Sequence, residues 1–267
     1  MVFRLINKFL LAVLATPFLA HAEQPKILTV VADTYCPYNC AVGAKQEGIL
    51  VDLTRAIFEA KGYQIRYKVV PWTRALKMVK EGKADIALGS PPEEADTHGL
   101  IKGNEPIGYG VDCVYVQADN PLKYNNRADD LNSLKKVGTV VDFQYYEQMG
   151  VWLQRPENKN KNFPARGETA SETNLIHLSL GRLDGVMETS AVMDYLIMQK
   201  KLQGKVRVAG CHKPQAVFNL FSPQRKDARQ LAAELDSGIL ALEKEGKVQQ
   251  ILDRYGVYQW KVINKAQ

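Results

Sequence analysis

Short β-branched runs and amphipathic stretches alternate along most of this 267-residue sequence. The first series consists of a strand at 27–32, a helical face that ends at Gly62, a strand at 65–70, a helix at 73–82 and a strand at 85–89. This β-α-β-α-β order is typical of a sheet of parallel strands covered by helices. We therefore predict an α/β fold.

A second series of the same kind follows. Its predicted elements are strands at 109–116 and 137–141, a helix at 142–150, a polar loop at 155–169, a helix at 172–180, a strand at 184–188, a helix at 190–201 and a strand at 206–210. The chain then continues with a strand at 216–222 and helices at 225–244 and 246–254. Because the first sheet has few helices to cover it, we expect the last two to return to it. Two strands would then cross between two lobes, with a cleft at the carboxyl ends of the strands and a hinge beside it.

The first 22 residues are typical of an export signal. Arg4 and Lys8 give a basic start, an apolar run occupies 9–20, and Ala20-His21-Ala22 has the small-residue form of a cleavage site. The run is shorter than the roughly 20 apolar residues that a transmembrane anchor needs. We expect a mature chain that begins near Glu23 and lies in the periplasm.

Composition excludes several classes of partner. Without residues 1–22 the chain has 33 basic and 29 acidic residues, a net charge of +4, and it has no basic block interleaved with aromatic residues. We therefore expect no nucleic-acid partner. No Gly-x-Gly-x-x-Gly follows the first strand and no P-loop is present, so we expect no nucleotide cofactor.

The four cysteines, Cys36, Cys40, Cys113 and Cys211, are most simply two disulfides in an exported chain. Three connectivities are possible, and we favour 36–40 with 113–211 because the first two are neighbours and the other two then remain. The spacing Cys-x3-Cys has one residue more than a thioredoxin motif, and no second pair at zinc spacing accompanies it. We expect no metal site.

Five segments resemble, in this order, the periplasmic solute-binding proteins of polar amino-acid importers, the bacterial extracellular family 3 type. They are "VADTYCPYN", "GILVDLTRAIFEAKGY", "PWTRALKMVKEGKADIALGS", "LGRLDGVMETSAVMDYLI" and "LEKEGKVQQILDRYG". The resemblance covers about 27–258. It implies a type II periplasmic binding protein fold, with 23–110 and 217–267 in one hinged lobe and 113–212 in the other. It also implies capture of a small polar solute, such as an amino acid, for a membrane ABC importer.

The resemblance implies ligand contacts from Tyr35 in the first loop, from Gly89 and Ser90 after the third strand, and from Glu188 and Thr189 in the second lobe. Glu188 stands near the position of the family's aspartate that takes an α-amino group. A 36–40 bridge would hold Tyr35 on a stiff loop, which preorganises binding.

Further candidates lie around these positions. Phe143 and Gln144, beside Asp142, occupy a corner where the family's second lobe meets its ligand; Asp142 would repel an anion there, or it caps its own helix. Trp72 and Tyr35 stand at comparable strand ends and are candidates to sandwich a flat or cationic ligand, with packing inside the lobe as the alternative.

The family's carboxylate-binding arginine is missing. In "GSPPEEADTH" its position corresponds to Thr97. Either the ligand is not an ordinary α-amino acid or another cation replaces the arginine, because a buried carboxylate without a charged partner is unfavourable. Arg74, in the first turn of a helix at the cleft end of the sheet, is the candidate; alternatively it is a surface residue or a partner of Asp85.

Two other functions fit the same fold. A periplasmic enzyme resembling cyclohexadienyl dehydratase would need an acid or base in the cleft, for which Glu188, Glu105 and His98 are the candidates. A module that reports its ligand to a membrane receptor is the other alternative. We expect a monomeric binding protein rather than an enzyme.

Overall fold

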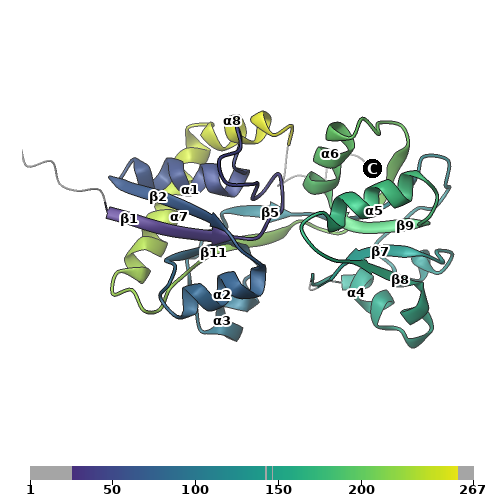
Figure 1. Ribbon diagram of the computed structural model, residues 1–267, viewed down its shortest axis with the longest axis horizontal. Coiled ribbons are helices and arrows are strands. Elements are labelled where there is room, and N and C mark those ends of the chain that lie inside the picture. The colour runs from purple at the N-terminus through teal and green to yellow at the C-terminus, as the bar shows by residue number, and fades with distance from the viewer. Residues whose placement is uncertain (1–25, 142, 146, 258–267) are drawn as a thin grey trace, which may run out of the picture.

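The computed structural model describes residues 26–141, 143–145 and 147–257, so the predicted export signal lies outside the described part of the chain. Figure 1 shows two lobes, each a sheet with helices on both faces, which two strands connect. The predicted two-lobed α/β architecture is confirmed.

The first lobe contains the strands in the order β2-β1-β3-β11-β4, with β5 also paired to β11. Their bounds are β1 (Lys26–Ala32), β2 (Tyr63–Val69), β3 (Ile86–Ser90), β4 (Ile101–Lys102), β5 (Gly108–Gly110) and β11 (Gln215–Phe221). β1 is parallel to β2 and β3, whereas β11 is antiparallel to β3. The carboxyl ends of β1, β2 and β3 therefore lie at the same edge, which faces the second lobe in Figure 1.

Helices cover both faces of this sheet. α1 (Ile49–Glu59), α7 (Ala228–Lys244) and α8 (Lys247–Arg254) lie on one face, and α2 (Trp72–Lys80) and α3 (Glu93–His98) on the other. α7 and α8 both pack against α1, so the end of the described chain returns to the first lobe. α3 is not predicted above, because its sequence "EEADTH" carries one buried residue, Ala95, and hence no apolar face.

The start of α1 is tied to the loop that precedes it. Gly48 has a φ of 125°, and a Cβ atom there would lie 2.3 Å from the carbonyl oxygen of Tyr38. Only glycine permits so close an approach. The buried side chains of Leu50, Leu53 and Phe58 then hold α1 against the sheet.

The second lobe has the strand order β10-β6-β9-β7-β8 within the described residues. Their bounds are β6 (Asp112–Gln117), β7 (Val137–Val140), β8 (Asn162–Ala165), β9 (Gly185–Thr189) and β10 (Val206–Cys211). The helices are α4 (Glu147–Gln154), α5 (Ala170–Ser179) and α6 (Ser190–Gln199), with short 3-10 helices η1 (Ala128–Leu131) and η2 (Pro156–Lys161).

Two predicted segments of this lobe differ from the structure. The segment 155–169, predicted as a polar loop, contains η2 and β8. Among the described strands β8 pairs with β7 alone, and it has none of the apolar alternation by which strands are recognised. The predicted helix at 142–150 begins at Glu147 in the structure, and residues 142 and 146 lie outside the described part.

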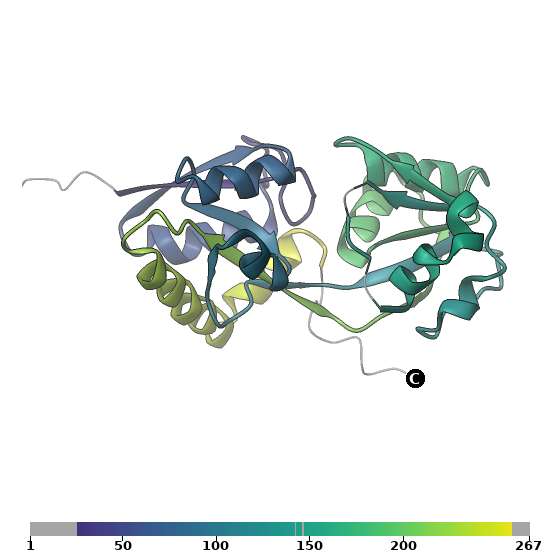
Figure 2. The ribbon, with the colours of Figure 1, turned by 90° about the horizontal axis from the view of Figure 1, so that it is seen from below.

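The chain crosses between lobes where the sequence shows one continuous strand at 109–116. That segment is split at Val111: β5 pairs with β11 in the first lobe, and β6 pairs with β10 and β9 in the second. The return passes from β10 to β11 through residues 212–214, and Figure 2 shows both connections side by side. A disulfide joins Cys113 to Cys211, which are paired residues on β6 and β10.

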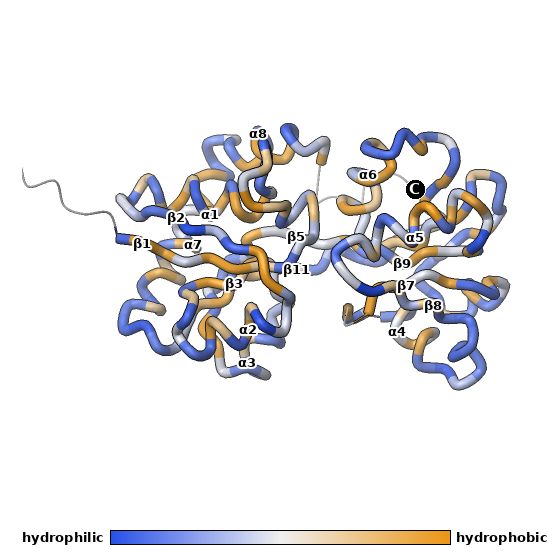
Figure 3. Tube along the Cα trace, in the orientation of Figure 1, coloured by the Kyte–Doolittle hydropathy of each residue, from blue (hydrophilic) through white to orange (hydrophobic). Residues whose placement is uncertain are grey.

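Apolar residues concentrate along the strands and on the inner faces of the helices in both lobes, as Figure 3 shows. The clusters on the two faces of each sheet bury large side chains such as Phe58, Trp152 and Tyr115. Each lobe therefore has a core of its own, and one cluster of the first lobe also includes Ala191 and Val192 of the second.

Candidate functional site

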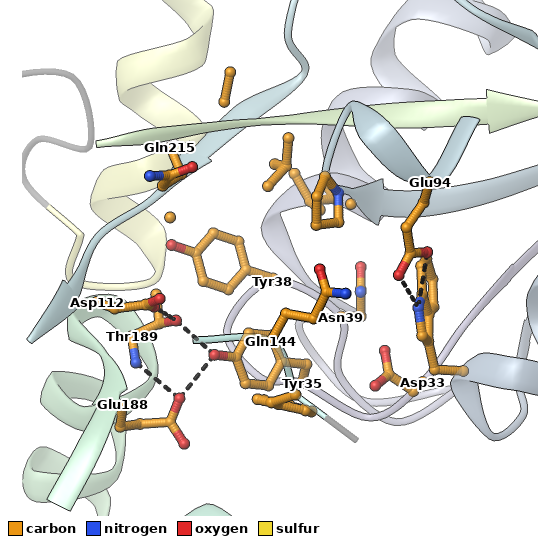
Figure 4. Close-up of a pocket in the computed structure, with 18 of the residues that line it drawn as sticks. Asp33, Tyr35, Tyr38, Asn39, Glu94, Asp112, Gln144, Glu188, Thr189 and Gln215 are labelled. Atoms are coloured by element: carbon orange, nitrogen blue, oxygen red, sulfur yellow. Dashed lines mark hydrogen bonds between the residues drawn. The ribbon is translucent and has the colours of Figure 1, made fainter. Parts of the chain in front are cut away.

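A cavity of about 180 Å³ lies between the lobes. This volume is below the roughly 300–1,000 Å³ of pockets for drug-sized ligands, so the cavity suits a small solute. The first lobe contributes, among others, Asp33, Tyr35, Tyr38, Asn39, Trp72, Gly89 and Glu94. The second lobe and the crossing strands contribute, among others, Asp112, Phe143, Gln144, Tyr145, Glu188, Thr189 and Gln215. Figure 4 shows the labelled members around the cavity.

The cleft loop, which we define as residues 33–48, is shaped by its own bonds. Cys36 and Cys40 form a disulfide, and the backbone N–H of Tyr35 donates to the carbonyl oxygen of Asn39 at 2.7 Å. The rings of Tyr35 and Tyr38 stack with their centroids 5.7 Å apart. The short bridge therefore closes a tight loop that presents two tyrosines to the cavity.

Tyr35 connects the two lobes. Its hydroxyl lies 2.7 Å from Glu188 Oε1 and 2.7 Å from Thr189 Oγ1, both at the end of β9. The ring of Phe143, also in the second lobe, meets the Tyr35 ring edge-on at 5.1 Å. A side chain of the cleft loop thus reaches across the cleft to the second lobe.

Glu188 is a buried carboxylate that protein donors surround. It is 2% exposed and accepts hydrogen bonds from the Ser171 hydroxyl, the Tyr35 hydroxyl and the backbone N–H of Thr189. Ser171 lies in the first turn of α5, and Thr189 directly precedes α6, so Glu188 sits at two helix N-termini, which favour negative charge. Burial nevertheless raises the pKa of Glu188 to about 7, against the effect of these hydrogen bonds.

Asp112 is bonded to a threonine and a histidine of the protein. Thr189 Oγ1 donates to Asp112 Oδ1 at 2.7 Å, and His212 Nε2 lies 3.2 Å from Asp112 Oδ2. The other ring nitrogen of His212 lies 2.7 Å from the carbonyl oxygen of Lys213, which only accepts, so both nitrogens face acceptors. Burial alone would lower the pKa of His212, but the Asp112 carboxylate outweighs it and the pKa is raised. A buried histidine whose pKa is raised thus pairs with Asp112 where the chain crosses between lobes.

The carboxylates of the first lobe are surrounded differently. Glu94 accepts weak hydrogen bonds from Trp72 Nε1 at 3.2 Å and from Ser90 Oγ at 3.3 Å, and Asp33 lies nearby at the end of β1. Burial raises the pKa of Asp33 to about 6; its own backbone N–H opposes the rise, and Glu94 adds to it. No described lysine, arginine or histidine pairs with either carboxylate.

The structure brings most of the predicted ligand residues together. Tyr35, Trp72, Gly89, Phe143, Gln144, Glu188 and Thr189 line the cavity. Ser90 lies behind the wall, fully buried, and its hydroxyl donates to Glu94. Asp142 lies outside the described residues.

Arg74 is not among the lining residues. It is exposed on α2, and Asp85, its suggested alternative partner, forms an ion pair with Arg225 at 2.8 Å instead. Helix α2 turns this side chain to solvent because Ala75, Leu76 and Val79 occupy the buried face. Thr97, at the position of the family's arginine, is also exposed and donates to the carbonyl oxygen of Glu93.

Sequence reasoning missed several residues that line the cavity. Asp33, Asn39, Glu94, Asp112, Tyr145 and Gln215 have no place in the prediction above. Asp33 directly follows a predicted strand and Asp112 precedes Cys113 at a predicted crossing, so their positions at strand ends were a usable signal. Glu94 had none, because α3 was not predicted.

The model of the bacterial extracellular solute-binding proteins, family 3, matches residues 27–258. The chain belongs to this family. Among curated proteins, a "Probable histidine-binding protein" of Neisseria gonorrhoeae is 26% identical over 162 residues, which are 59% of this chain and 56% of that protein. The alignment thus spans little more than half of that relative's length.

Solved structures share the fold of this family 3 chain. A protein of glutathione import in Streptococcus mutans aligns with a TM-score of 0.70 at 17% identity, covering 89% of this chain and 98% of that one. A histidine kinase sensor domain similar to periplasmic binding proteins aligns with a TM-score of 0.67 at 21% identity, covering 87% and 96%. An ancestral arginine-binding protein bound to arginine aligns with a TM-score of 0.66 at 16% identity, covering 87% and 99%. At these identities the likeness concerns the fold alone.

The described residues contain no group of three or more His, Cys, Asp or Glu side chains placed to hold a metal ion. No helix among them combines the length and the apolarity that a membrane crossing needs.

Proposed function

We propose that this chain is a periplasmic binding protein that captures a small, positively charged solute between its lobes and delivers it to an ABC importer. The observation that carries the proposal is the charge of the cavity wall. Asp33, Glu94, Asp112 and Glu188 line it, and no lysine, arginine or histidine does so among the residues that the structure describes. Aromatic rings complete the wall, and they attract cations through their faces.

Two further observations support periplasmic transport. Members of family 3 are extracellular solute-binding proteins, and residues 1–22 have the pattern of an export signal. The curated relative is named for histidine, an amino acid with a basic side chain. A cationic ligand agrees with this name.

A thermal-shift screen of the mature chain, unfolded and refolded to remove carried-over ligand, tests the proposal. We expect basic amino acids or amines to raise the melting temperature and acidic solutes to leave it unchanged. A ligand at 100 times its dissociation constant should add about 2.7 kcal/mol to the free energy of unfolding. Stabilisation by acidic or neutral solutes alone would contradict a cationic ligand.

One observation favours the enzymatic alternative. Glu188 lines the cleft with a pKa near 7, and a group with such a pKa can exchange protons at neutral pH. The other two candidates, Glu105 and His98, are not among the lining residues. Incubation with an arogenate-like cyclohexadienyl compound decides: we expect no product, and turnover that Glu188→Gln abolishes would assign catalysis instead.

A further inference from the structure

We propose that the ligand is a carboxylate-free amine or guanidine, whose cationic head lies between Asp33, Glu94 and the indole of Trp72. This inference rests on the proposed function and names the substrate class of the same cleft. It differs from the ligand class that the sequence resemblance implies, since α-amino acids carry a carboxylate.

The first-lobe end of the cavity contains two carboxylates that no described cation neutralises. Asp33 and Glu94 stand close enough for their charges to interact, with no described cation beside them. Asn39, which also lines this end, is 3% exposed, and its Oδ1 atom has no hydrogen-bond partner. Carboxylates are nearly always paired when they are partly buried, so Asp33 and Glu94, with no cation beside them among the described residues, favour a ligand that supplies donors and positive charge. Ammonium and guanidinium groups are donors only.

Four side-chain donors of the wall are directed at protein acceptors. Trp72 Nε1 donates to Glu94, and the Tyr38 hydroxyl donates to the carbonyl oxygen of Tyr109 at 2.9 Å. Thr189 Oγ1 donates to Asp112, while the Tyr35 hydroxyl faces Glu188. An incoming carboxylate would have to displace an existing hydrogen bond to use any of these groups.

The place that would favour an anion is already filled. Glu188 occupies the N-terminal ends of α5 and α6, where the helix dipoles stabilise negative charge. The protein's own carboxylate therefore stands where a ligand carboxylate would be most stable. Together with Asp33, Glu94 and Asp112, it makes a ligand carboxylate a like charge in a confined space.

Titration calorimetry with matched pairs tests the inference. Agmatine and arginine, cadaverine and lysine, and histamine and histidine share a head group and differ by the α-carboxylate. We expect the decarboxylated member of at least one pair to bind at least tenfold more tightly than its parent. Equal or tighter binding of the parent in every pair that binds overturns this inference and leaves the proposed function intact. Binding of none of the six, with stabilisation by neutral or acidic solutes instead, overturns both.

A pair of variants on α3 tests the position of the head. Glu94→Gln keeps the shape and removes the charge, and we expect it to weaken the tightest amine at least tenfold. Asp96→Asn is the matched control, because Asp96 is exposed on the same helix and does not line the cavity; we expect no change. Asp33→Asn provides a second variant from another element, with the same expected loss. Unchanged amine affinity in both Glu94→Gln and Asp33→Asn would overturn the placement.

Discussion

The two lobes contribute carboxylates to the same cavity, but they surround them in opposite ways. In the second lobe Glu188 accepts hydrogen bonds from Ser171, Tyr35 and Thr189, and Asp112 pairs with His212. In the first lobe, Asp33 and Glu94 have no such ion-pair partner within the described residues, and Glu94 accepts only long hydrogen bonds from Trp72 and Ser90. The carboxylates of the second lobe therefore have partners within the protein, whereas those of the first lobe lack a positively charged partner among the residues that the structure describes.

This difference suits the two sets of carboxylates to different roles, one in holding the structure and one in binding the ligand. A carboxylate whose acceptor capacity is met by the protein stabilises the position of the strands and loops around it. A carboxylate that lacks a partner has charge to offer a ligand. We infer that the second lobe provides a fixed wall, and the first lobe the charge that selects the solute.

Removing the disulfide of the second lobe should produce the largest loss of stability. The Cys113–Cys211 bridge lies next to the Asp112–His212 pair and closes a segment with a sequence separation of 98. Replacing both cysteines by serine should lower the free energy of unfolding by about 4.7 kcal/mol on the loop-entropy model. Chemical denaturation at equilibrium measures the change.

The other disulfide supplies the control. Cys36 and Cys40 are four residues apart, so their removal should cost only about 2 kcal/mol on the same model. If both double variants lose the same stability, the long bridge does not hold the second lobe as described here.

The second prediction compares one carboxylate from each lobe. Glu188→Ala leaves the donors of Ser171, Tyr35 and Thr189 without their acceptor and should reduce the free energy of unfolding by about 2–4 kcal/mol. Glu94→Gln should change it by less than about 0.5 kcal/mol, because Glu94 is partly exposed and weakly bonded. Urea titrations of the unliganded proteins test both, and equal losses would remove the distinction between the lobes.

Much of the fold was predictable because it follows from local pattern. The apolar runs that became β1, β2, β3, β7 and β9 and the helical faces of α1, α5 and α7 are visible in the sequence. Of the three cysteine connectivities that the sequence allows, the favoured one is found in the structure. β8 and α3 were missed because they lack an apolar face, and tertiary pairing rather than sequence pattern defines them.

The site was less predictable for a physical reason. Tyr35 and Glu188 could be placed by resemblance, but the partners that decide their roles are distant in sequence, as the separation of 153 residues between these two shows. Arg74 was chosen because the family's arginine is missing, and only the packing of α2 shows that it faces solvent. The sequence lacks the arginine by which the family binds a carboxylate. The structure shows that two carboxylates, Asp33 and Glu94, line the cavity without a described cation beside them.

The third prediction concerns pH. Asp33 has a pKa of about 6 in the folded protein, against an ordinary value of 3.8, and a cation binds best to its deprotonated form. Amine affinity should therefore be constant above pH 7 and fall below pH 6, towards about tenfold for each pH unit. Calorimetry between pH 5 and 8 with a ligand that stays protonated measures this profile.

The free energy of unfolding of the unliganded protein should change with pH in the opposite direction to the amine affinity, which gives a second test. Because the folded state binds this proton more tightly, the contribution of Asp33 to unliganded stability is present below pH 3.8 and is lost as pH rises through 6. Asp33→Asn should flatten both profiles. Glu188, with a pKa of about 7, titrates in an adjoining range, so a slope that persists in Asp33→Asn would assign the effect to the second lobe.

The smallest effect is expected at the contact between the lobes. Tyr35→Phe keeps the ring contacts with Tyr38 and Phe143 and removes the hydroxyl that faces Glu188. Loss of one such bond should cost about 1 kcal/mol, or roughly fivefold in affinity. Tyr67→Phe is the matched control, because the Tyr67 hydroxyl donates to the carbonyl oxygen of Cys40 within the first lobe and Tyr67 does not line the cavity, so its affinity should stay within about twofold. Since the Tyr35 bond joins the lobes around the ligand, its loss should appear mainly as faster dissociation, measured by stopped flow. An equal change in both variants would mean that the hydroxyls act by local packing, and the cleft loop would then not be the element by which the first lobe holds the second.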